Sequence, residues 1–296
     1  MPPKLAHLGF WGWMEPQVLI VSLLVAGLYL LVVDGPLGRA FPDRAPVPAA
    51  KQVAFVGAML VVYAAFGGPL DVLADGYLFS AHMLQHVLEA MAAAPLLLIG
   101  TPDWLCRPLL RNRVTGWLLR RTTRPVQAIA IFNVIFALAF WPGFYTLMEV
   151  NGFVHFGYHA ILLIASLIMW WPLLSPLPEL PRLHPGLQIL YVFLDGLPML
   201  VPGAIVGLTY YTVYSFYNHT PRLFGFSQLG DQQFGGILCI VSIHLVLGAA
   251  FIVAFRKWVR EERGNRALPT AQSMGDFEAD GYVPGTGRRA VWADQD

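Results

Sequence analysis

The sequence contains few charged residues, because Asp, Glu, Lys and Arg together make up only 12% of its 296 positions. A typical soluble domain carries about 25%. Hydrophobic residues make up 56%, and the mean hydropathy is +0.57. So few charges cannot cover a globule in water, which excludes an ordinary soluble enzyme, and a net charge of +1 gives no basic surface for nucleic acid. The composition predicts a protein that lies mostly in a lipid bilayer.

Several patterns that mark particular chemistries are also absent. The three lysines, Lys4, Lys51 and Lys257, lie at the edges of apolar segments, so no lysine inside the membrane is placed to form a retinal Schiff base. The two cysteines, Cys106 and Cys239, are expected at different membrane levels, which argues against a disulfide. No phosphate-binding loop, serine nucleophile elbow or HExxH zinc motif occurs.

Long apolar segments dominate what is present. A spanning helix needs roughly 20 mostly apolar residues. The sequence therefore predicts an all-α, polytopic transmembrane helix bundle with seven spans in residues 1–258, followed by a polar tail, 259–296, that is expected to be disordered and cytoplasmic. The predicted spans cover residues 17–33, 52–66, 78–99, 126–148, 153–174, 187–208 and 234–258.

The basic residues predict the orientation of these spans. When seven spans are assigned, every Lys and Arg except Lys4 and Arg222 falls on the same side of the membrane. Because cytoplasmic loops carry an excess of Lys and Arg, the N-terminus is expected outside and the C-terminus in the cytoplasm. One cytoplasmic segment, residues 103–121, mixes Trp, Leu and Arg and is predicted to lie as an amphipathic stretch at the membrane interface.

Two identical histidine patterns open two of the spans. The third span begins with HMLQH, which contains His82 and His86, and the fifth begins with HFGYH, which contains His155 and His159. Residues four apart share one face of a helix, and both spans are expected to enter from the outside, so the two pairs should lie at the same depth. Neutral imidazoles suit copper and zinc. The four side chains therefore predict a metal site, with a hydrogen-bonded histidine network that ties helices together as the structural alternative.

Four further polar residues are candidates for the same chemistry. Asp231 opens the seventh span on the outer side and is expected to join the histidines as a metal ligand. Glu89 follows one turn below the first histidine pair, where it could accept from an imidazole N–H or take up a proton. Asp195 and His244 lie deeper, in the sixth and seventh spans, and are candidates for a proton path.

The wider sequence around these residues resembles a known family. Together with the two HxxxH pairs, the chain contains AAAPLLLIGTPDWL, FNVIFALAFWPGFY, WWPLLSPLP, LYVFLDGLPMLVPGAI and DQQFGG. This combination, spread over roughly residues 78–258, resembles the CtaG-type cytochrome c oxidase assembly factors of the caa3 branch, which are seven-span bacterial membrane proteins. The family's two histidine pairs fall on His82, His86, His155 and His159, and its acidic start of the last span falls on Asp231.

The resemblance implies a non-enzymatic role in building the copper-containing core of a haem–copper oxidase. It implies copper as the metal, oxidase subunits and the lipid bilayer as partners, and the bacterial inner (cytoplasmic) membrane as the location. Three other functions stay open on the residues alone. These are a membrane b-type cytochrome with histidine-ligated haem, an intramembrane zinc hydrolase, and a scaffold that binds no metal.

Overall fold

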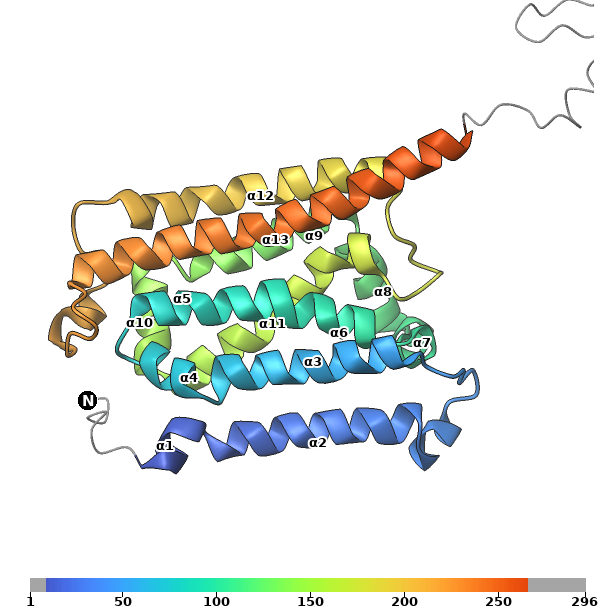
Figure 1. Cartoon of the computed structure of the whole chain (residues 1–296), viewed down its shortest axis with the longest axis horizontal. Coiled ribbons are helices and arrows are strands. Elements are labelled where there is room, and N and C mark those ends of the chain that lie inside the picture. The colour runs from blue at the N-terminus through green and yellow to red at the C-terminus, as the bar shows by residue number, and fades with distance from the viewer. Residues whose placement is uncertain (1–8, 266–296) are drawn as a thin grey trace, which may run out of the picture.

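A computed structural model describes residues 9–265 of the chain. Every regular element in this part is a helix, and the long helices run side by side along one direction (Figure 1). This confirms the predicted all-α transmembrane bundle. The last helix, α13 (Gln228–Asn265), continues past the boundary that was expected at Trp258, and the rest of the predicted tail lies outside the described residues.

Six of the seven predicted spans are helices, or continuous series of helices, that are long and apolar enough to cross a membrane. Short elements extend two of them, because α4 follows α3 and a π-helical turn, η3, joins α5 to α6. The bounds are α2 (Pro16–Val33), α3 (Ala49–Phe66) with α4 (Pro69–Ala74), α5 (Phe79–Leu88) with η3 (Glu89–Ala93) and α6 (Ala94–Gly100), α11 (Gly152–Leu174), α12 (Pro185–Leu208), and α13.

The fourth predicted span is broken. It consists of α9 (Pro125–Leu138) and α10 (Pro142–Val150), whose axes differ by 69°. Pro142 has no N–H to continue the helix, and it restricts the residue before it, so Trp141 adopts an extended conformation with φ −78° and ψ 117°. The bundle therefore has seven spans when the bent pair is counted as one. The predicted orientation of the termini stays a prediction.

The helix α11 packs against α6 and α9 and has an exposed outer face that includes Phe153 and Phe156. The series α5, η3 and α6 lies in the middle of the bundle (Figure 1). The pair α2 and α3 lies along one side of this series, and the pair α12 and α13 lies along the other. Two short helices, α7 (Asp103–Arg111) and α8 (Arg113–Thr122), lie at one end of the bundle, while α4, α10 and the first turn of α5 lie at the opposite end. The short elements α1 (Phe10–Met14) and η4 (Ser215–His219) lie at the same end of the bundle as α4 and α10. The short element η2 (Pro36–Ala40) lies at the other end, with α7 and α8.

Local sequence determines where the helices begin. Proline, whose missing N–H costs nothing in a first turn, occupies that position in α2, α4, α9, α10 and α12. The start of α11 is capped by Asn151, whose Oδ1 accepts from the backbone N–H groups of Phe153 at 3.1 Å and Val154 at 3.2 Å. This cap fixes the first turns of the helix that carries His155 and His159.

The helices α12 and α13 approach each other closely along a line of glycines. A Cβ atom on Gly236 would lie 2.6 Å from the backbone nitrogen of Gly207 and 2.7 Å from the carbonyl oxygen of Gly203. Small residues allow such backbone contact between membrane helices. The Gly203–Gly207 pair is therefore used for packing within the chain.

We expect Gly236→Ala to lower the stability of the bundle, because its methyl group would force α12 and α13 apart. Overpacking of this kind costs about 1–3 kcal/mol. The matched control is Gly248→Ala on the same helix, where a Cβ atom would meet nothing within 4 Å. Thermal unfolding of both variants in one detergent should show a lower midpoint for the first variant only. Equal midpoints would contradict the close contact.

Candidate metal centre

The structure brings the two histidine pairs together at the end of the bundle that contains α4 and α10. His82 and His86 lie in the first turns of α5 and are completely buried. His155 and His159 lie in the first turns of α11 and are half-buried. The ring centroids of His82 and His155 are 4.9 Å apart, and those of His86 and His159 are also 4.9 Å apart. The four imidazoles thus converge, as the spacing of the sequence predicted.

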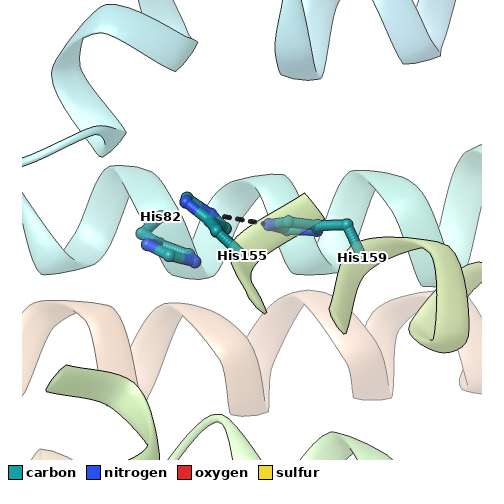
Figure 2. A group of neighbouring side chains, drawn as sticks. All are labelled: His82, His155 and His159. Atoms are coloured by element: carbon teal, nitrogen blue, oxygen red, sulfur yellow. Dashed lines mark hydrogen bonds between the residues drawn. The ribbon is translucent and has the colours of Figure 1, made fainter. Parts of the chain in front are cut away.

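Three of the four rings are close enough to share one ion. One nitrogen from each of His82, His155 and His159 lies within 4.8 Å of the other two (Figure 2). The Nε2 atoms of His155 and His159 are 3.1 Å apart. Two ligands in a tetrahedral site with metal–nitrogen distances of about 2.0–2.1 Å would be about 3.4 Å apart. The spacing of His155 and His159 is therefore close to that of two bound ligands, and a nitrogen of His82 lies within 4.8 Å of one from each.

Carboxylates hold the other nitrogen of two of these rings. The Nδ1 atom of His159 is 2.8 Å from Oε2 of Glu89, and the Nδ1 atom of His82 is 2.8 Å from Oε1 of Glu149. Both carboxylates are buried. Because a carboxylate accepts, each Nδ1 carries the proton and each Nε2 keeps its lone pair. Metal-binding histidines have this same outer partner, which fixes the tautomer and the ring orientation.

The two glutamates differ in how far the sequence indicated them. For Glu89 the sequence left open a bond to an imidazole N–H or proton uptake, and the structure shows the first, with a histidine of the other pair, on α11. Glu149 was missed, because the predicted fourth span ended at Met148 and the next residue was counted as a loop. The bend between α9 and α10 instead turns α10 so that Glu149 points into the bundle with no exposed side-chain surface. An acidic residue directly after an apolar span was the available signal.

The position of Glu89 depends on the π-helical turn η3. In this turn the N–H of Ala94 bonds to the carbonyl of Glu89, five residues back, and the next residue, Pro95, has no N–H for the carbonyl of Ala90. The indole Nε1 of Trp170, on α11, donates to that carbonyl instead, at 2.8 Å. Single π-helical turns recur at functional sites. Here the turn is held from α11, the helix that also carries the partner of Glu89.

Unpartnered buried atoms are concentrated at this cluster. His82 Nε2, both ring nitrogens of His86 and Glu149 Oε2 have no hydrogen-bond partner among the described residues. Leaving one such buried atom unpaired costs about 1–3 kcal/mol. Native structures contain few of them, so four at one place give this cluster an unusual number of polar atoms that could bond to a ligand. His86 lies beside the three-nitrogen group, with its ring centroid 4.7 Å from that of His82.

A chain of two tyrosines connects the cluster to the loop that follows α12. The hydroxyl of Tyr145 is 3.1 Å from Nδ1 of His82 and 2.5 Å from the hydroxyl of Tyr217. Burial raises the pKa of Tyr217, with the negative charge of Glu149 as the next cause. Asp75, after α4, also has a raised pKa, mainly through burial and then through Glu149, while His82 opposes the shift. Acidic groups are therefore close to His82 at this end of the bundle.

Asp231 has a different place from the one predicted. Its Oδ2 accepts from the backbone N–H of Phe79 at 2.8 Å, and its Oδ1 accepts from the N–H of Ser80 at 3.2 Å and the hydroxyl of Ser80 at 2.5 Å. The carboxylate therefore lies at the N-terminus of α5, where it offsets the exposed amides and the helix dipole. The structure does not bring Asp231 into the three-nitrogen group; it anchors the helix that carries His82.

Asp195 and His244 lie away from the cluster. Oδ1 of Asp195 accepts from Nδ2 of Asn133 at 3.0 Å, across the contact between α9 and α12. Nδ1 of His244 donates to the carbonyl of Ile240 at 2.7 Å. Neither residue forms a hydrogen bond with the four histidines among the described residues, so the structure does not connect the predicted proton path to this site.

Residues 27–261 match a protein family described as the cytochrome c oxidase caa3 assembly factor. No curated protein and no solved structure matches the chain. The match covers both histidine pairs and the two glutamates that hold them.

We expect Trp170→Phe to destabilise the protein by about 1–3 kcal/mol, because the buried carbonyl of Ala90 loses the indole N–H that donates to it. Trp171→Phe is the matched control, since the adjacent indole is also buried but its Nε1 has no partner within residues 9–265. Thermal unfolding in detergent should separate the two variants. Equal loss in both would mean that the bond to Ala90 does not support the π-helical turn.

Proposed function

The chain belongs to the cytochrome c oxidase caa3 assembly factor family, and from this premise we propose that its histidine cluster holds a copper ion and passes it to an oxidase subunit. Copper is the cargo in this proposal, and no substrate bond is made or broken. The chain is a multi-pass membrane protein. We place it in the bacterial inner membrane, with the cluster at the outer face, because the basic residues gather at the opposite side.

One observation carries the proposal. The nitrogens of His82, His155 and His159 converge within 4.8 Å, and two of the three rings are held by buried carboxylates on their far side. Imidazole suits copper. The carboxylates of Glu89 and Glu149 accept the Nδ1 protons of His159 and His82, so the Nε2 lone pairs of these two rings are available to a metal. The unpartnered Nε2 of His82 is accounted for by such an ion.

A carrier must also release its metal. Three protein nitrogens leave a position free on a four-coordinate ion, and a ligand from the receiving subunit can enter there. The half-buried His155 gives this access from the surface, while His82 is completely buried. The acidic residues Asp75 and Glu149 add negative charge close to His82, which favours a cation at this end of the bundle.

The alternative functions fit this geometry differently. A haem needs two axial ligands on opposite faces of a flat macrocycle, whereas the rings of His82 and His155, on facing helices, are stacked with their centroids 4.9 Å apart and leave no room for a macrocycle between them. This disfavours the b-type cytochrome. A zinc ion with three histidines and a water would fit the same nitrogens, so the identity of the metal separates the zinc hydrolase from the copper carrier.

The direct test is the metal content of the purified protein after copper loading. We expect about one copper per chain, and none in the double variant His155→Ala/His159→Ala. The control is His244→Ala, which removes a membrane imidazole outside the cluster. Glu89→Gln should weaken copper affinity about 10–100-fold, because it replaces the acceptor that orients His159.

Three results would overturn this proposal. Equal copper in the wild type and the double variant would remove the histidines as the site. Stoichiometric zinc with no copper uptake would favour the hydrolase. A Soret band in the visible spectrum would favour the cytochrome.

A genetic test separates assembly from copper binding. A bacterial strain without this gene should keep its oxidase polypeptide but lose oxidase activity, and added copper should restore part of that activity. A gene copy with His244→Ala should complement the strain, and one with His159→Ala should not. If both copies complement equally, the cluster is not needed for oxidase assembly, even if the purified protein binds copper.

A further inference from the structure

A second site lies at the other end of the bundle, next to α7 and α8 (Figure 1). It is a pocket with a volume of about 390 Å³, which is within the range of roughly 300–1,000 Å³ found for ligand sites. Its lining is mostly charged and consists of Asp43, Arg107, Leu110, Arg111, Arg120 and Glu179. We propose that this pocket binds the phosphodiester headgroup of an anionic phospholipid.

Acidic residues hold two of the three arginines in place. Arg107 donates to Asp103 at 2.9 Å, and it lies 3.6 Å from Glu179 and 3.8 Å from Asp43. Arg111 donates to Asp43 at 2.7 Å. The two guanidinium groups are thus oriented side by side around one carboxylate. Each guanidinium has five N–H donors, so donors remain for a further anion.

The third arginine is the one that these pairs leave without a carboxylate. Arg120 is exposed in the last turn of α8, and no ion pair within the described residues includes it. Arg107 and Arg111 are already balanced by Asp43, Asp103 and Glu179, so Arg120 is the guanidinium at this pocket that is available to pair with one phosphodiester. The planar guanidinium fork matches the geometry of phosphate oxygens better than a lysine does.

The apolar face of α8 identifies the phosphate as part of a lipid. Val114, Trp117 and Leu118 are exposed by 66%, 62% and 45%, and their spacing places them on one face of the helix. A helix with such a face and arginines beside it lies in the membrane interface. Because α7 and α8 connect the end of one span, α6, to the start of the next, α9, the pocket opens at the level of the headgroups.

The test measures which phospholipid the full chain retains. The protein is purified from detergent micelles that contain equal amounts of phosphatidylglycerol and phosphatidylcholine, and the bound lipid is extracted and quantified. About 1 M salt shortens the Debye length to about 3 Å, so general attraction to basic residues is screened. We expect the wild type to prefer phosphatidylglycerol and Arg120→Gln to lower this preference about tenfold, because a charge-assisted contact is lost.

The matched control is Arg260→Gln, which removes the same charge from an exposed arginine of α13, outside the pocket lining and away from the apolar face of α8. It should change the preference less than about twofold. Equal losses in the two variants, or no preference in the wild type, would overturn the proposal. Displacement of the lipid by inorganic phosphate at the same concentration would also overturn it, because the pocket would then be a site for a soluble anion. These results do not depend on copper binding.

Discussion

A carboxylate buried in a membrane protein needs a hydrogen-bond donor or a positive charge beside it. Two such carboxylates, each with a histidine as its partner, organise the interior of this protein. An isolated buried charge costs several kcal/mol even after the protein relaxes. Glu89 and Glu149 meet this constraint by accepting from His159 and His82 at 2.8 Å. Each pair joins different helices, since one links η3 to α11 and the other links α10 to α5. The same hydrogen bonds that offset the cost of burying the carboxylates also orient the imidazole rings toward one another.

The surrounding structure supports this arrangement at its helix ends and turns. Asp231 anchors the start of α5, and Asn151 caps α11, so both histidine-bearing turns begin at fixed positions. Trp170 completes the π-helical turn from which Glu89 projects. Together with the two glutamate–histidine bonds, these contacts join α5, η3, α10, α11 and α13, which explains how residues far apart in the sequence are held within a few ångströms.

Much of this could be predicted from local patterns, and the rest depended on contacts between helices. The length of the apolar segments predicted the spans, and the four-residue spacing predicted that each histidine pair shares a face. Hydropathy could not show that Pro142 breaks the fourth span, so Glu149 was not recognised as a buried residue. Asp231 has a carboxylate that could bind a metal, but it caps α5 instead. Because it lies about 150 residues after α5 in the sequence, no local pattern indicates this contact. His244 satisfies its Nδ1 within its own helix, which no sequence pattern indicates.

The three histidines of the group are not held alike. His82 and His159 are each fixed by a carboxylate, whereas Nδ1 of His155 forms no hydrogen bond among the described residues. Nε2 of His155 bonds only to His159, at 3.1 Å, so among the described residues no group outside the histidine cluster fixes this ring through a hydrogen bond. An ion bound here would have two ligands held by carboxylates and one that is not. Release of an ion from such a site would have a preferred direction. The ion would detach first from His155 and leave through the surface that this residue faces.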